Sequence, residues 1–475
     1  MRIDELTYFE SEEFKETLAR YEAALREGRP IYMEAEELTD VAEYYMTKER
    51  EEDADRCIRT ALEMHPDAID PQIFVARREL FHDNIEKARE LAGAIQPQEE
   101  REVQFLWAEI RIKENRQQEA SQQLMHYFRT LTEEKDYFLY DAAGVFMDYN
   151  EWDIALMWAE ELKKRYPQFE KADFLIADIK VCCGKCQEAI PLLEAILSKA
   201  PFFEDGWSLL AEAHSALEHY EEALEAIEYV LALNEKSLSA MLIRANCLFH
   251  LQRMEETHAQ YSAYLQECPD DASVMYFNAV TLTNMEEYEQ AMRLLSTALD
   301  KVSDTMSELR SNIYYQFSYL LNKMGKTDIA LALLEKAYEL EKKEPDSDYY
   351  LLKAQIHLEN STGEDVTELH EKALELSPDK PHTRLCIAVC YAECGMYLQS
   401  AQRLQDILSD ITCIMPDKEA RCLPYLAYCS HFVARDKYSA LLREAIMVNP
   451  NLTTFLFKHI YPENTLATIS KEAGL

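Results

Sequence analysis

Glycine, long apolar runs and basic residues are all scarce in this sequence. Only 9 of the 475 residues are glycine, whereas sheet proteins of this length use many glycines in their hairpin turns. A strand-rich fold is therefore excluded. No run of 18 apolar residues occurs, so no membrane-spanning helix is predicted. Residues 1–6 (MRIDEL) lack the apolar core of a signal peptide, and we expect a cytoplasmic protein.

The shortage of basic residues restricts the ligands that this surface can attract. The chain has 49 Lys and Arg against 88 Asp and Glu, giving a net charge of −39. Such a surface repels phosphate backbones and anionic lipids, so we expect neither nucleic acid nor membrane as a partner. It favours solubility and the approach of basic proteins or peptides.

Sequence motifs for catalysis are also missing. The chain has no Gly-rich phosphate loop, no HExxH and no nucleophile elbow. We therefore predict no enzyme activity, no cofactor and no metal site.

The twelve cysteines, without a signal peptide, are expected to be free thiols in a reducing compartment. They include two clusters, one at 182–186 (CCGKC) and one formed by His382, Cys386, Cys390 and Cys394. Ligands four residues apart on a helix drift around it, so the second cluster cannot converge on one ion as a whole. Packing as small apolar residues is the favoured interpretation for both clusters. A metal- or redox-responsive regulator using Cys386, Cys390 and Cys394 is an alternative.

A regular helical pattern fills most of the chain. Residues 204–237 contain two amphipathic segments separated by a short polar break at Glu218–His219. A small residue recurs at the same place in the first segment, and from Ala143 to Ala279 each step is 34 residues. The full series of small residues is Ala42, Ala76, Ala108, Ala143, Ala177, Ala211, Ala245, Ala279, Ser318, Ala354, Ala388 and Ala427.

This pattern resembles the tetratricopeptide repeat family, whose unit is a helix hairpin of 34 residues. The resemblance covers nearly the whole chain, with about twelve units. It implies an all-α fold, a right-handed superhelical solenoid of antiparallel helix pairs. We predict an N-terminal capping helix in 1–34, near-regular repeats in 35–302, an insertion at 303–310, less regular repeats in 311–450, and a C-terminal capping helix and tail in 451–475.

Several irregularities accompany the repeats. We expect a capping helix near Glu12–Arg26 that ends at Gly28, and a closing helix at Thr453–Tyr461 followed by a frayed tail from Glu463. Residues 303–309 are predicted as a longer helix or a loop, and 360–364 (NSTGE) as a polar turn. Pro191 is expected near the first turn of its helix, where a proline removes few hydrogen bonds.

The resemblance also implies where a partner binds. In this family the first helices line the concave face, and the second, fifth, ninth and twelfth positions of each unit point into it. Tyrosine and asparagine at these positions suit the recognition of a peptide. The candidate partner-binding residues are Tyr137, Tyr140, Asn246, Tyr276, Asn312, Tyr315, Tyr319 and Asn322.

The chain is therefore interpreted as a non-catalytic protein-interaction scaffold or adaptor that binds a peptide or helix in its groove. A groove for chaperone C-terminal carboxylates is excluded, because no set of Lys and Arg accompanies Asn246. The remaining alternative is a self-assembling structural protein, a homo-oligomer formed through the Cys-rich repeats or through 455–461.

Overall fold

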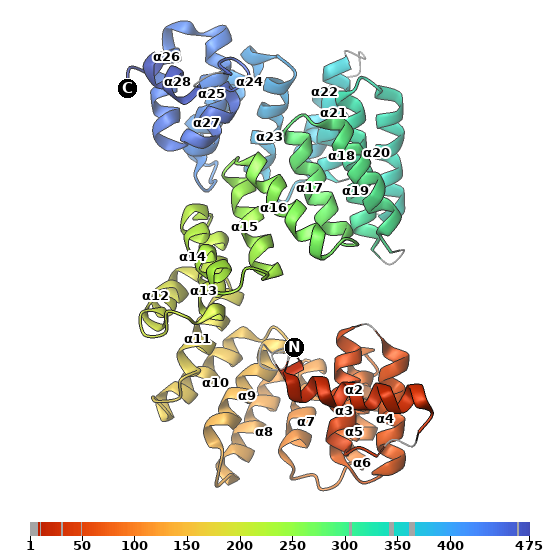
Figure 1. Ribbon diagram of the computed structural model, residues 1–475. Coiled ribbons are helices and arrows are strands. Elements are labelled where there is room, and N and C mark those ends of the chain that lie inside the picture. The colour runs from red at the N-terminus through yellow and green to blue at the C-terminus, as the bar shows by residue number, and fades with distance from the viewer. Residues whose placement is uncertain are drawn as a thin grey trace. The chain divides into compact units, whose positions relative to one another are not determined.

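The computed structural model describes residues 8–9, 11–29, 32–48, 50–303, 306–341, 346–360, 366–462 and 465–475. Every regular element among these residues is a helix (Figure 1). The chain divides into two compact units, unit 1 at Met1–Leu217 and unit 2 at Glu218–Leu475. None of the described helices is long and apolar enough to cross a bilayer.

Unit 1 contains the following helices: α2 (Glu12–Glu27), α3 (Ala35–Thr47), α4 (Glu51–Met64), α5 (Ile69–Phe81), α6 (Ile85–Ala94), α7 (Arg101–Lys113), α8 (Gln117–Thr130), α9 (Lys135–Asp148), α10 (Trp152–Arg165), α11 (Ala172–Cys182), α12 (Cys186–Leu197) and α13 (Glu204–Ala216).

Unit 2 contains the following helices: α14 (Tyr220–Leu233), α15 (Leu238–His250), α16 (Met254–Glu267), α17 (Ala272–Asn284), α18 (Tyr288–Lys301), α19 (Ser307–Lys323), α20 (Thr327–Glu341), α21 (Ser347–Asn360), α22 (Val366–Leu376), α23 (Lys380–Glu393), α24 (Tyr397–Ser409), α25 (Lys418–Val433), α26 (Arg435–Val448), α27 (Pro450–Phe457) and α28 (Thr465–Ala473).

Within each unit, consecutive helices pair as hairpins, for example α3 with α4 and α23 with α24. Successive first helices also contact one another, as α3 does α5 and α23 does α25, so they form one layer. The predicted fold class, all-α with antiparallel helix pairs, is confirmed.

The predicted small residues lie where the helices approach most closely. Each of the twelve, from Ala42 to Ala427, has no exposed surface. At Ser318 the hydroxyl group donates a 2.7 Å hydrogen bond to the carbonyl of Ala330, across the hairpin of α19 and α20. A larger side chain at these positions would push the paired helices apart.

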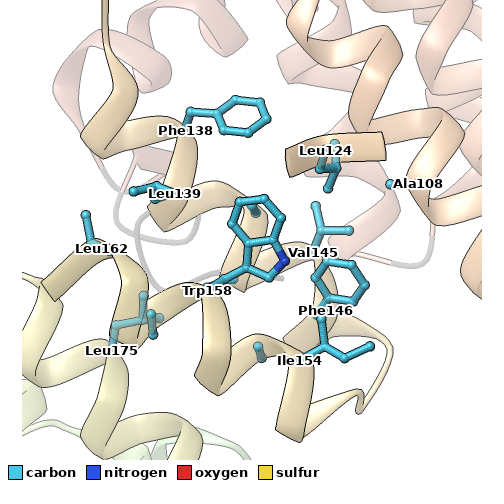
Figure 2. Packing of buried hydrophobic residues seen from close by; sticks show 14 of the residues in the cluster. Ala108, Leu124, Phe138, Leu139, Val145, Phe146, Ile154, Trp158, Leu162 and Leu175 are labelled. Carbon is cyan, nitrogen blue, oxygen red and sulfur yellow. The ribbon is translucent and has the colours of Figure 1, made fainter. Parts of the chain in front are cut away.

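Larger side chains fill the space around these contacts. Figure 2 shows Trp158 of α10, which has no exposed surface, between helices α9 and α8. Its indole Nε1–H donates to Ser121 Oγ at 3.1 Å, so the one polar atom of this side chain is satisfied. Phe138 stacks on Phe105 with ring centroids 5.0 Å apart.

The first helix of the array agrees with the prediction from the sequence, whereas the last helix does not. Helix α2 begins after Ser11, whose Oγ accepts from Phe14 N, and ends at Gly28 in the left-handed conformation, as predicted. The prediction of a frayed tail is wrong. Residues 465–473 form α28, and fully buried Ile469 and Ala473 attach it to the core. The hydrophobic pattern of this short segment is too weak to predict a helix, and α28 packs against α26.

Three further predicted irregularities concern Pro191, the insertion at 303–310 and the turn at 360–364. The sequence predicts Pro191 near the first turn of its helix, but it is the sixth residue of α12, which begins at Cys186. At the predicted insertion, α18 ends at Lys301 and α19 is a longer helix of 17 residues. Residues 304–305 lie outside the described chain, as does most of the predicted turn at 360–364.

Nine of the described hairpin turns share one backbone conformation. Each of these nine places a single residue in the left-handed region, with φ between 60° and 77°. The residues at this position are Asp83, Asn115, Asn150, Gly184, Glu218, Gln252, Glu286, Gly325 and Gly395. Glycine adopts this conformation freely, while other residues pay about 1 kcal/mol for it.

We expect Gly184→Ala to destabilise the protein by about 1 kcal/mol, because the added methyl group would force an L-residue to keep φ at +77°. The site is open, with no atom within 4 Å of the added Cβ, so the cost would come from the backbone alone. The measurement is the urea midpoint followed by circular dichroism.

Gly93→Ala is the matched control for this prediction. Gly93 lies in helix α6 and its added Cβ also meets no atom within 4 Å, so this change should stabilise by about 0.5–1 kcal/mol. Equal shifts of the same sign in both variants would contradict the turn interpretation.

Candidate functional site

Unit 2 has a hollow with a volume of about 810 Å³ along its first helices. Helices α21, α23 and α25 form most of its wall, and the turn between α15 and α16 closes one side. The start of α27 contributes Asn451 and Leu452. The cavity volume lies in the range of about 300–1,000 Å³ that is usual for binding pockets.

The lining combines acidic, aromatic and apolar side chains. Its carboxylates are Glu218, Asp348, Glu393 and Asp417, and its only arginine is Arg421. Arg421 is engaged by Glu218, with both carboxylate oxygens 2.8 Å from Nη2. The apolar and aromatic side chains that line the wall include Tyr220, Tyr315, Leu351, Leu385, Val389 and Tyr425.

Two of these carboxylates are held in unfavourable surroundings. Burial raises the pKa of Asp348, and Asp346 adds to the effect, while His382 opposes it. Burial also raises the pKa of Glu393, although Lys323 lies 3.8 Å from it and Gln355 Nε2 donates to it at 2.9 Å. A raised pKa of a carboxyl group means that its negative charge is incompletely compensated.

The predicted partner-binding residues are distributed over both units, and the cavity includes only one of them. Tyr137 and Tyr140 belong to unit 1, where both rings contact Phe169. The other six belong to unit 2, and of these Tyr315 lines the cavity. Asn246 and Asn312 are exposed on α15 and α19.

The remaining predicted residues take part in packing. Tyr276 and Tyr319 are half-buried against core clusters of unit 2. Asn322 is buried: its Nδ2 donates to Glu359 at 2.6 Å, and its Oδ1 accepts from Asn360 at 2.8 Å. These contacts attach α19 to α21.

Part of the cavity lining follows from the periodic inward positions of the repeat. These positions lie six and three residues before each small residue, and one and four residues after it. Applied to Ala354, Ala388 and Ala427, they give twelve residues, of which Asp348, Leu351, Gln355, His382, Leu385, Val389 and Arg421 line the cavity. The lining does not include the other five, Leu358, Ala392, Pro424, Tyr428 and His431. The signal was therefore present in the later repeats.

The same positions line a smaller hollow of about 180 Å³ in unit 1, formed by first helices α3, α5 and α7. It is strongly acidic, with Glu36, Asp40 and Asp70 among its residues. The Tyr8 hydroxyl donates to Asp40 at 2.8 Å, and Arg77 makes a bidentate pair with Glu109. Its charges are thus partly matched within the chain.

The described residues form stacked helix hairpins. A comparison with family models identifies the type of hairpin, because residues 208–272 match the model described as Tetratricopeptide repeat. This part of the chain therefore carries the tetratricopeptide repeat, and the match supports a protein-interaction scaffold in general terms.

Solved structures with the same type of fold have low sequence identity to this chain. A tetratricopeptide repeat protein from Parabacteroides merdae is 16% identical, and the match covers 61% of this chain and 98% of that chain with a TM-score of 0.36. Cut9 in the APC/C hetero-tetramer Cut9-Hcn1 is 13% identical, covering 92% and 93% with a TM-score of 0.37. The human IFIT1 dimer is 14% identical, covering 78% and 89% with a TM-score of 0.40. No curated protein matches the sequence.

Two cysteines of the second cluster, Cys386 and Cys390, have raised pKa values. Burial raises the pKa of Cys386 to about 11, and Cys394 together with burial raises that of Cys390. Thiols with raised pKa values are poor nucleophiles and poor metal ligands at neutral pH. Among the residues that the structure describes, no group of three or more His, Cys, Asp or Glu could hold a metal ion.

Two histidines of the packed helices are shielded from solvent to different extents. His214 is half-buried, and His370 of α22 is only 3% exposed. The ring of His370 lies 5.4 Å from that of Tyr391, and neither of its ring nitrogens has a hydrogen-bond partner among the described residues. Burial, and then the Arg403 guanidinium, lower the pKa of His370 to about 4.

This lowered pKa predicts acid sensitivity. The unfolded chain protonates His370 near pH 6.5, whereas the folded chain resists protonation down to about pH 4. Stability is therefore lost as the pH falls from about 6.5 towards 4, by about 3 kcal/mol at most. His370→Leu should lose less stability than the wild type between pH 7 and pH 4.5, as measured by urea midpoints. Equal losses in the two proteins would refute this role of His370.

Proposed function

We propose that this protein is a non-catalytic scaffold whose unit 2 binds a basic segment of a partner protein in the cavity along its first helices. The observation that carries the proposal is the cavity itself, since helices from successive repeats contribute side chains to one half-open cavity of about 810 Å³. A concave surface removes more of a ligand from water than a flat one.

The charge of the lining favours a cationic occupant. The only arginine of the lining, Arg421, is already paired, while Asp348 and Glu393 have raised pKa values. A lysine or arginine side chain between Asp348 and Glu393 would supply the missing positive charge and lower both pKa values. The net charge of −39 would also draw basic partners towards the molecule before they dock.

The aromatic side chains suit the same occupant. Tyr315 of α19 and Tyr425 of α25 line the cavity and are half-buried. Tyrosine rings contact the aliphatic part of a lysine side chain and attract its ammonium group through the ring face. The cavity thus offers apolar contact for the side-chain stem and negative charge for its end.

We expect fluorescein-labelled pentalysine to bind wild-type protein, and Asp348→Asn/Glu393→Gln to weaken the binding at least tenfold. The measurement is fluorescence anisotropy in 100 mM salt, with pentaglutamate as the probe of opposite charge. Because burial raises the pKa of both carboxyl groups, neutralising them should not lower the melting temperature.

The matched control is Glu289→Gln/Asp300→Asn, which removes two exposed carboxylates of α18 outside the cavity. This control should bind pentalysine within twofold of the wild type. If both double variants weaken the binding to the same extent, the peptide responds only to the overall charge, and the cavity is not the site.

A further inference from the structure

The last helices of unit 2 return to its first hairpin turns. Arg421 of α25 pairs with Glu218 across 203 residues of sequence, at 2.8 Å. Lys458, at the end of α27, pairs with Glu255 across the same separation, at 3.1 Å. His459 Nε2 lies 3.8 Å from Glu286. We call these three pairs the clasp.

The acidic partners of the clasp belong to successive repeats. Glu218 and Glu286 are the left-handed residues of their hairpin turns, and Gln252 takes this position in the repeat between them. Glu255 is the second residue of α16, directly after that middle turn. The clasp therefore joins one edge of three consecutive repeats to the C-terminal part of the array.

The clasp borders the cavity described above. Glu218, Gln252 and Arg421 line it, and so do Asn451 and Leu452 of α27. Beside the Glu218–Arg421 pair, the rings of Tyr220 and His250 stack with centroids 4.5 Å apart and parallel planes. Any segment entering from this side must pass the contact between the turns and the C-terminal helices.

Two of the three clasp pairs are well exposed. The side chains of Lys458 and Glu255 are 59% and 67% exposed, and those of His459 and Glu286 are 62% and 59% exposed. The Arg421–Glu218 pair is partly buried, with side chains 32% and 42% exposed. Ion pairs of this kind are weak singly and are screened by salt, whose Debye length is about 8–10 Å at physiological ionic strength. They can hold a contact closed and still release it.

We propose that the clasp is a gate of the cavity, which opens when a basic segment competes with Arg421 and Lys458 for Glu218 and Glu255. A ligand shifts an equilibrium only through different interactions with the two states, and the carboxylates released on opening provide that difference. The clasp contacts form without a ligand, whereas the role of the clasp as a gate rests on the proposed function.

The closure is tested on the free protein with a carbodiimide, which converts an amine–carboxylate contact into an amide bond. We expect a Lys458–Glu255 crosslink in 20 mM salt, identified by mass spectrometry, and a yield at least fivefold lower in 1 M salt. Arg421→Glu should lower the yield at least fivefold in 20 mM salt, and Glu218→Arg/Arg421→Glu should restore it. Arg435→Glu on α26, the matched charge change outside the clasp, should crosslink as the wild type does. An unchanged yield in Arg421→Glu would overturn the clasp.

The gate is tested with the association rate of labelled pentalysine. Lys458→Gln/His459→Gln removes two clasp groups that do not line the cavity, and we expect association at least fivefold faster than in wild type. Arg435→Gln/Lys437→Gln, two changes on α26 away from the clasp, should increase the rate less than twofold. Equal acceleration in both variants overturns the gate and leaves the cavity site intact. A crosslink that behaves as expected, without pentalysine binding in the cavity, would instead reject the proposed function.

Discussion

The close approach of paired helices at one small residue per hairpin is the constraint on which the rest of this structure depends. From Ala42 to Ala427, each such residue is completely buried. Because a repeat buries its surface only against its neighbours, the separation set at one hairpin passes to the next. Within each unit, successive first helices are thereby brought into contact. The cavity of unit 2 is a consequence of this spacing, since residues from α21, α23 and α25 meet there only if the helices stack at close range.

The helix pairs and their packing faces could be predicted from the sequence because they are local. A period of 34 residues specifies hairpin after hairpin, and alternation between small and large apolar side chains specifies which face is buried. The helix before the first repeat could be predicted for the same reason, through Ser11 and Gly28 at its ends. Helix α28 could not be, because nine residues with little periodicity become helical through contacts with α26 and α27.

The candidate site could be predicted only in part, because no single repeat determines the curvature of the array. The inward positions are periodic, and Tyr315 follows from them. Which inward positions share a cavity depends on how far the array bends, and that brings Arg421 to Glu218 across 203 residues. Residue type is misleading as well, because Tyr319 and Asn322 pack within the chain. Asp348, His382 and Arg421 occupy the repeat position that Asn312 has in its own repeat, and they line the cavity.

Nine hairpin turns each carry one left-handed residue at the same place in the repeat. It recurs at 218, 252 and 286 with nearly the same backbone angles, so its side chain leaves each hairpin in an equivalent direction. Its identity does not affect the buried face, and glutamate, glutamine, asparagine, aspartate and glycine all occur there. Charge at this position can therefore change by single substitutions, independently of the core.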